Sequence, residues 1–308
     1  MRILVIGAGA VGGYFGGRLA EAGRDVTFLV RPRRADEIRK QGLRIVSPHG
    51  DATTYPRIIL AHEINGPYDL IFLSVKAYGL AGAMEDFAAA VGPATMILPV
   101  LNGMRHLERL GTGFGRQAVL GGVCFVSADL GVDGEIVQLT ETQKLVYGEL
   151  EGGVSERMQT LDEAMQGANF QAQSSEHILQ DMWEKWVLLA SLGALTCLLR
   201  GNVGEIENVH GGAEIALGVL RECSDISTAC GFAPNQARML KTQKSFTTKG
   251  STLTSSMYRD LMKGGHVEVD QIIGDLLRRG QEHNVPAPLL QAAFVNLSVY
   301  SARLGPLG

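Results

Sequence analysis

The pattern G-x-G-x-x-G occurs at Gly7-Ala8-Gly9-Ala10-Val11-Gly12. An apolar run precedes it and a helix-like stretch ending at Gly23 follows it, which is the setting that a dinucleotide-binding turn requires. The first glycine permits the tight turn, the second lets a pyrophosphate approach the backbone, and the third lets helix and strand pack closely. Amides at the positive end of the helix would then hold the phosphates. We expect residues 7–12 to bind a dinucleotide, and a glycine turn without a ligand is the alternative.

The second predicted strand ends in a basic run, Arg31-Pro32-Arg33-Arg34, instead of an acidic residue. In an NAD site, Asp or Glu about 20 positions past the glycines binds the ribose 2′-hydroxyl, whereas an Arg accommodates the 2′-phosphate of NADP. Arg31 is the first residue after the strand, so we expect it to contact this phosphate and the cofactor to be NADPH or NADP. A solvated charged run is the alternative for each arginine.

Reduction of a carbonyl by a nicotinamide also needs an acid that protonates the oxygen. The chain contains no Y-x-x-x-K, and its seven histidines and four cysteines lack the spacing of metal ligands, so no metal site is expected. Lys185 stands where a helix enters its apolar run, with Leu188, Leu189 and Leu192 on the same face. Lys185 is therefore a candidate proton donor, and an exposed pair with Asp181 is the alternative.

The composition limits the classes of protein to which the chain can belong. Its 308 residues carry a net charge of −4 and are 45% hydrophobic, which is ordinary for a globular protein and disfavours nucleic acid as a partner. The uncharged apolar stretch of residues 186–199 is too short to span a bilayer, and no targeting segment precedes the first strand. We expect a cytoplasmic protein with free thiols that does not act on membranes. The apolar helices would suit a homodimer interface or an internal core.

Short strand-like runs alternate with helical stretches in the first half of the chain, which predicts an α/β fold with a doubly wound, Rossmann-type parallel sheet. The predicted strands are Ile3 to Ile6, Val26 to Val30, Leu70 to Val75, Met96 to Val100 and Val119 to Val126. Hairpins are predicted around residues 47–51 and 133–134. Helical periodicity then takes over, with breaks near residues 201, 231–234, 244–256 and 285–288. We expect an NADP-binding domain over residues 1–173 and an all-helical substrate domain over residues 174–308.

Five blocks in order give the chain a resemblance to the ketopantoate reductase (2-dehydropantoate 2-reductase) family over nearly its whole length. They are the glycine motif at 7–12, Ser74-Val75-Lys76-Ala77-Tyr78, Leu101-Asn102-Gly103-Met104, Trp183-Glu184-Lys185, and Ser255 to Asp260 leading to Glu268-Val269-Asp270. Five ordered blocks are far more specific than one glycine motif.

The resemblance implies a role for each matching residue. Lys185 matches the proton-donating lysine, Glu268 a glutamate that contacts the ligands, Ser256 a contact to the substrate carboxylate, and Asn102 an asparagine near the nicotinamide and substrate. Lys76 and Arg31 match contacts near the adenosine phosphate. Ordinary alternatives exist, since Glu268 could be a first-turn helix carboxylate, Ser256 a helix cap, Asn102 a turn residue and Lys76 a solvated lysine.

The chain departs from the family pattern at three asparagines. The family reads K-x-x-x-N-x-x-x-N after its lysine, where this chain has Leu189 and Gly193, and Val203 stands where a third asparagine precedes Gly-Glu, with Asn202 one place early. Each lost hydrogen bond to a polar ligand costs about 0.5 to 1.5 kcal/mol. We expect NADPH-dependent reduction of a 2-keto acid, most simply ketopantoate to pantoate in pantothenate and coenzyme A formation. The alternatives are a more apolar 2-keto acid and a protein that senses NADPH without turnover.

Titration of the purified protein with NADPH and NADH tests the assignment of Arg31. We expect NADPH to bind more tightly, because only NADPH carries the 2′-phosphate that a guanidinium can hold. Equal or tighter binding of NADH would contradict this prediction.

Overall fold

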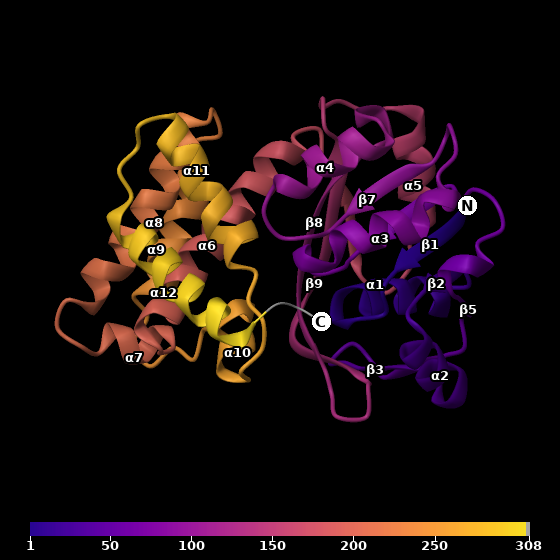
Figure 1. The fold of residues 1–308 in the computed structure, drawn as a ribbon, viewed down its shortest axis with the longest axis horizontal. Coiled ribbons are helices and arrows are strands. Elements are labelled where there is room, and N and C mark those ends of the chain that lie inside the picture. Colours follow the sequence, from indigo (N-terminus) through magenta and orange to yellow (C-terminus); the bar gives the residue numbers. More distant parts are fainter. Residues whose placement is uncertain (306–308) are drawn as a thin grey trace. The chain divides into compact units, whose positions relative to one another are not determined.

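The computed structural model describes residues 1–305, which form two compact units (Figure 1). The first unit comprises Met1–Leu101 and His106–Leu179. The second comprises Asn102–Arg105 and the chain from Gln180 onward. The four residues Asn102–Arg105 therefore pack with the helical unit, although the chain on both sides of them belongs to the first unit.

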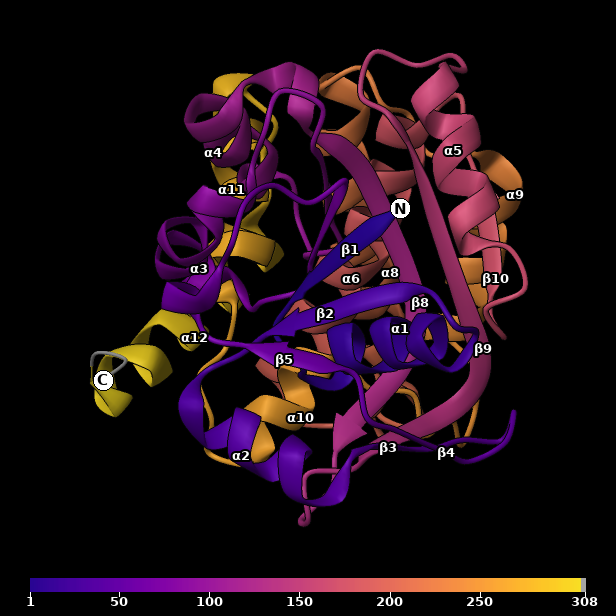
Figure 2. The same cartoon turned by 90° about the vertical axis from the view of Figure 1, so that its right-hand side faces the viewer.

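The first unit is built on a five-stranded parallel sheet with β1 at its centre (Figure 2). Its strands, in spatial order, are β5 (Arg57–Ile59), β2 (Asp25–Leu29), β1 (Arg2–Ile6), β6 (Leu70–Leu73) and β7 (Met96–Pro99). Ile3 pairs with Val26 on one side and Leu70 on the other. The polar residues that follow β1, β2 and β6 therefore lie at one edge of the sheet.

Helices cover both faces of this sheet, which confirms the predicted doubly wound fold. Alternate β1 residues pack on opposite cores: Ile3 joins Phe15 of α1 (Ala10–Glu21), whereas Leu4 joins Phe87 of α3 (Leu80–Phe87) and Leu110 of α4 (Arg105–Phe114). All five of these side chains are completely buried. Burial on both faces explains why the strands read as continuous apolar runs. Helix α2 (Pro32–Gln41) follows β2.

A second sheet, which the sequence did not predict as a unit, contains both predicted hairpins. Its strands are β3 (Leu43–Val46), β4 (Ala52–Thr54), β8 (Leu120–Leu130), β9 (Ile136–Glu149) and β10 (Gln171–Ser174). The predicted strand Val119 to Val126 also belongs here and not to the parallel sheet, because it forms β8 and pairs antiparallel with β9, while β5 is the fifth strand of the parallel sheet. β3 and β4 are antiparallel around residues 47–51, and β8 and β9 are antiparallel around residues 133–134. Helix α5 (Glu156–Met165) lies between β9 and β10 in the sequence.

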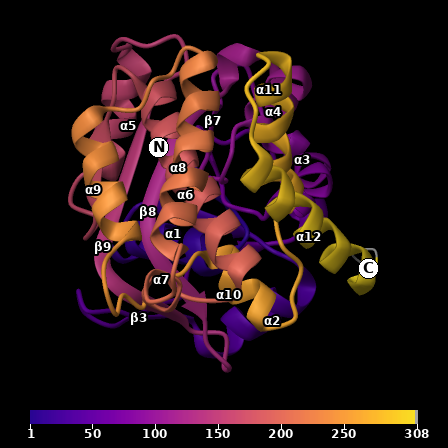
Figure 3. The ribbon, with the colours of Figure 1, turned by 90° about the vertical axis from the view of Figure 1, so that its left-hand side faces the viewer.

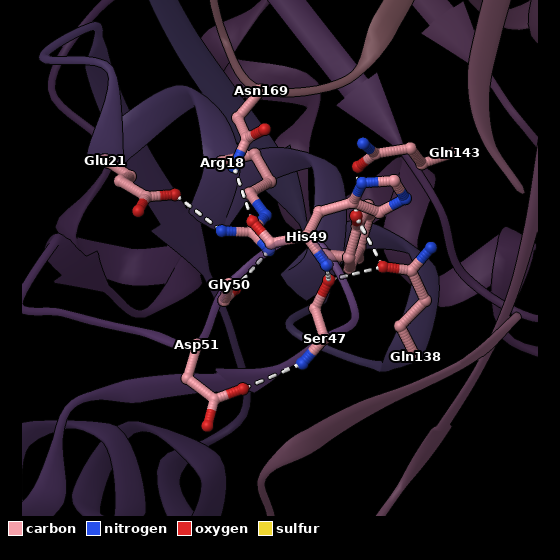
Figure 4. Close-up of polar contacts among 10 residues, drawn as sticks. Arg18, Glu21, Ser47, His49, Gly50, Asp51, Gln138, Gln143 and Asn169 are labelled. Carbon is pink, nitrogen blue, oxygen red and sulfur yellow. Dashed lines mark hydrogen bonds and ion pairs between the residues drawn. The ribbon is translucent and has the colours of Figure 1, made fainter. Parts of the chain in front are cut away.

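A buried polar cluster fastens the turn between β3 and β4 (Figure 4). Arg18 of α1 is 1% exposed, and its guanidinium donates hydrogen bonds to the Gly50 carbonyl at 2.7 Å and to Glu21 at 2.8 Å. Ser47 donates to the Gln138 amide oxygen of β9 at 2.6 Å. The turn is thus bonded to α1 through Arg18 and to β9 through Ser47. The bonds to Gly50 and Glu21 also give the buried Arg18 guanidinium the partners that it needs.

The second unit is helical, with no strand among residues 180–305 (Figure 3). Its helices are α6 (Ile178–Leu199), α7 (Val203–Glu207), α8 (Gly212–Ala229), α9 (Gln236–Phe246), α10 (Ser256–Met262), α11 (Asp275–Glu282) and α12 (Pro288–Leu304). The four breaks between helices predicted from the sequence are confirmed. Helix α8 contacts α7, α9, α11 and α12. A π-helical turn, Asp270–Gly274, precedes α11.

Helix α6 is longer than its uncharged stretch suggested. It spans 22 residues and is the one helix within residues 1–305 that is long and apolar enough to cross a membrane, yet 67% of its most apolar window is buried inside the protein. Ser191 and Thr196 donate hydrogen bonds to carbonyls one turn earlier, at 2.6 and 2.7 Å. These bonds satisfy the hydroxyls inside a core, so α6 serves as a buried core helix.

The four cysteines should react unequally with a thiol reagent. Burial raises the pKa of Cys197 and of Cys223 to about 12, and Cys124 is also buried, whereas Cys230 is partly exposed. Because the thiolate is the reactive form, we expect at most one fast thiol per chain in the native protein at pH 8. Unfolding in detergent should release all four. Three or four fast thiols without denaturant would contradict the described core.

Candidate functional site

The glycine motif forms the turn between β1 and α1. Gly7 has φ +88° and donates its amide to Leu29 at 3.0 Å, and a Cβ at Gly12 would lie 2.0 Å from the Ser74 hydroxyl and 2.4 Å from the Gly7 carbonyl. The fold itself therefore requires glycine at both positions.

Gly9 is different, because the fold alone does not require it to be glycine. Its φ is −79°, and a Cβ there would meet no described atom within 4 Å. It is also the N-cap of α1, and no side chain caps this helix start. A bare backbone beside a helix N-terminus fits the pyrophosphate of a dinucleotide.

Two predicted cofactor contacts follow the strands on either side of β1. Arg31 is exposed at the start of α2, two residues after β2, and Lys76 is exposed three residues after β6. Because β2 and β6 both pair with β1 in parallel, these residues and the glycine turn follow the same ends of three neighbouring strands. The structure therefore brings Arg31, Lys76 and residues 7–12 to one sheet edge.

Arg34 supports the glycine turn, although the sequence predicted it only as one member of a solvated charged run. Its guanidinium donates hydrogen bonds to the Ala8 carbonyl and to Glu37, each at 3.1 Å. The hydrogen bond from Arg34 lowers the pKa of Glu37. The i,i+3 spacing of Arg34 and Glu37 was the available signal, although it does not reveal the contact to Ala8.

The predicted nicotinamide contact, Asn102, belongs to a tight turn that packs on the π-helical turn. Gly103 has φ +78°, and a Cβ there would lie 2.6 Å from the Gln271 carbonyl oxygen. The Gln271 amide donates a hydrogen bond to the Asn102 carbonyl at 3.1 Å. Only glycine permits this approach of two backbones, so the Asn102-Gly103 pair is matched to the π turn.

Glu268 and Lys185 are linked to the same π turn. Glu268 is 9% exposed, and its carbonyl accepts the amide of Ile272 at 3.0 Å. Lys185 is half-buried on α6, and the indole of the next residue, Trp186, donates to the Ile272 carbonyl at 2.8 Å. Within the second unit, Asn102, Glu268 and the helix that carries Lys185 are thus each linked to one turn.

Ser256 does not cap helix α10. The capping residue is Ser255, whose hydroxyl accepts the Tyr258 amide at 2.9 Å and lies 3.0 Å from the Thr196 hydroxyl. Ser256 is the first residue of the helix and is half-buried. The alternative that Ser256 is the helix cap is therefore wrong.

The structure shows what surrounds the positions at which the chain departs from the family's asparagines. A Cβ at Gly193 would lie 2.6 Å from the terminal methyl of Met257, which is 3% exposed, and Leu189 is half-buried on the same helix. Asn202 accepts the Glu205 amide at 2.9 Å, and Glu205 accepts the Asn202 amide at 2.8 Å, which is a capping box. Two of the family's three asparagines are therefore absent from this chain. The third is shifted by one position to Asn202, and its side-chain oxygen caps helix α7.

Two models of one protein family match most of the chain. The model "Ketopantoate reductase PanE/ApbA" matches residues 3–152, and "Ketopantoate reductase PanE/ApbA C terminal" matches residues 177–301. The chain belongs to the ketopantoate reductase family. It is accordingly an NADP-dependent oxidoreductase, and the glycine turn and Arg31 fit that cofactor.

Individual relatives match almost the whole chain. The "uncharacterized oxidoreductase YkpB" of Bacillus subtilis is 35% identical over 98% of this chain and 99% of that protein. A 2-dehydropantoate 2-reductase from Mesorhizobium japonicum is 26% identical over 95% of each chain. The crystal structure of 2-dehydropantoate 2-reductase from Methylococcus capsulatus has 27% identity and a TM-score of 0.86, covering 100% of this chain and 99% of that one.

Alanine at Gly9 and at Gly12 should have opposite effects. Gly9→Ala leaves the folded chain without a clash, so we expect a change in Tm of only a few degrees but at least tenfold weaker NADPH binding, because the methyl group would occupy the space for the pyrophosphate. Gly12→Ala meets backbone and should cost about 1 to 3 kcal/mol of stability. Calorimetry and NADPH fluorescence titration measure both effects. Unchanged NADPH affinity in Gly9→Ala would contradict the assignment.

Proposed function

We propose that this protein reduces a 2-keto acid to the 2-hydroxy acid, with ketopantoate to pantoate as the most direct reaction. The observation that carries the proposal is that Asn102, Glu268 and the helix of Lys185, which come from three distant parts of the sequence, are each hydrogen-bonded to the π turn Asp270–Gly274. An acid, a carboxylate and an amide are the groups that carbonyl reduction and keto-acid binding need.

The proposed division of labour follows from the chemistry of each side chain. Bound NADPH supplies a hydride to the ketone carbon. Lys185 donates the proton to the ketone oxygen, so the carbonyl gains one hydrogen on carbon and one on oxygen and becomes the 2-hydroxy group, while NADPH becomes NADP. Glu268 is nearly buried and orients the ligands, Asn102 offers its amide to the substrate and nicotinamide, and Ser256 donates its hydroxyl to the substrate carboxylate.

The first unit binds the cofactor in this proposal. The amides of residues 7–12 hold the pyrophosphate at the uncapped start of α1. Arg31 and Lys76, both exposed beside this turn, contact the phosphate of the adenosine half. The positive charge of both side chains favours NADPH over NADH.

A more apolar 2-keto acid is a second candidate substrate, and one contact favours it. Met257 fills the space beside Gly193 where a family asparagine would project, and Leu189 replaces the other asparagine on that helix. An apolar wall cannot replace two hydrogen bonds to a substrate hydroxyl, each worth about 0.5 to 1.5 kcal/mol. The same wall suits a branched or aromatic side chain.

A role in the pathway to pantothenate and coenzyme A belongs to the same proposal, since it follows from ketopantoate as the substrate. The free cysteines support the cytoplasmic location that we also propose. A substrate that is not ketopantoate would remove the pathway role and leave the reductase chemistry unchanged.

Replacement of Lys185 tests the proposed acid. We expect Lys185→Met to lower kcat by at least about 100-fold, because loss of a positioned acid typically costs that much, while NADPH affinity changes less than about threefold. Lys241→Met, at an exposed lysine of α9, is the matched control and should keep wild-type turnover. A Lys185→Met protein with substantial turnover would show that another group protonates the oxygen.

A substrate panel tests the function itself. Wild-type kcat/KM is compared for ketopantoate, 4-methyl-2-oxopentanoate and phenylpyruvate, and Leu189→Asn/Gly193→Asn restores the family's two amides. We expect the double variant to shift the preference toward ketopantoate about 5- to 150-fold, the equivalent of about 1 to 3 kcal/mol. Leu199→Asn, at the exposed end of α6, should shift nothing. Tight NADPH binding without reduction of any acid would favour a sensor.

A further inference from the structure

We infer that Gln271 is a positioning residue of the reducing site, which makes Asn102 move with Lys185 and Glu268 instead of with the sheet that precedes it. The inference rests on the proposed function of that site. It assigns to Gln271 a task that neither the motifs nor the mechanism above requires.

A hydrogen bond from Gln271 links Asn102 to the helical unit. Asn102 directly follows Leu101, the last residue before the unit boundary, yet residues Asn102–Arg105 pack with the second unit. The hydrogen bond from the Gln271 amide to the Asn102 carbonyl, at 3.1 Å, joins residues 169 positions apart. Gln271 is 8% exposed and Asn102 is half-buried, so the bond is partly shielded from water.

Gln271 meets the turn through its backbone as well as its side chain. Its carbonyl oxygen lies where a Cβ at Gly103 would come within 2.6 Å. The side-chain amide of Gln271 therefore bonds to Asn102, and its main-chain carbonyl packs closely against the next residue, Gly103. Two such contacts define the orientation of the turn as well as its position.

The π-helical geometry explains why Gln271 can do this. A π turn widens the helix and is often found at functional sites, because it disturbs the regular pattern of backbone hydrogen bonds. Here the carbonyl of Ile272, the next residue, accepts the Trp186 indole at 2.8 Å. Gln271 and Ile272 thus anchor the Asn102 turn and the Lys185 helix respectively, only three and four residues after Glu268.

Three variants separate the hydrogen bond of Gln271 from its shape. Gln271→Glu keeps the shape but loses the donor, Gln271→Met also removes polarity, and Gln281→Met makes the same change at an exposed glutamine of α11. Because a displacement of about 1 Å at a reacting group can cost about 100-fold in rate, we expect both Gln271 variants to lose at least tenfold in kcat. KM for NADPH should change less than threefold, since the glycine turn is untouched.

Hydrogen–deuterium exchange supplies a readout that does not need turnover. Peptides covering residues 101–105 should take up deuterium faster in both Gln271 variants, while peptides of α8 stay unchanged and Gln281→Met behaves as wild type. The inference is overturned if Gln271→Glu keeps wild-type kcat and wild-type exchange at 101–105, or if exchange rises over the whole second unit. Absence of turnover in the wild-type protein would defeat the proposed function, and exchange alone would then decide the role of Gln271.

Discussion

Two hydrogen bonds to one π-helical turn, one buried and one partly buried, link the segments that carry Lys185, Glu268 and Asn102. The Gln271 amide binds the Asn102 carbonyl, and the Trp186 indole binds the Ile272 carbonyl. A buried polar group left without its partner costs about 1 to 3 kcal/mol, so each bond strongly favours one arrangement. The local order around Lys185 and Asn102 depends on these two bonds, whereas the surrounding apolar core is not directional.

The cofactor turn depends on a different constraint, which is steric. Gly12 must be bare because Ser74 and the Gly7 carbonyl occupy the space of a side chain, but Gly9 is bare without such a reason inside the protein. The fold therefore requires Gly12, and we propose that a bound cofactor accounts for Gly9. Arg34 secures the turn through the Ala8 carbonyl, and Arg31, which we propose as a cofactor contact, is exposed.

The sequence predicted four of the five parallel strands, both hairpins and the helix breaks, because each leaves a local pattern of apolar periodicity and turn residues. It placed residues 119–126 in the wrong sheet, since a local pattern does not show which strand is the partner. It also named Lys185, from its apolar helix face and the resemblance to the family, and Glu268 and Asn102, from the resemblance alone. It could not predict the π turn, since residues 270–274 read as ordinary helix, nor the contact of Gln271 with a residue 169 positions away. Ser255 and Ser256 are adjacent and chemically identical, so only the structure distinguished cap from neighbour.

The central claim is that a hydride passes from NADPH to the ketone carbon of a 2-keto acid. Incubation with NADPH deuterated at either face of the nicotinamide C4, followed by mass spectrometry of the product, tests it directly. The account predicts a 2-hydroxy acid that carries one deuterium at C2 from one of the two labelled cofactors. Product with only protium at C2 from both cofactors, or consumption of NADPH without a hydroxy acid, would contradict it.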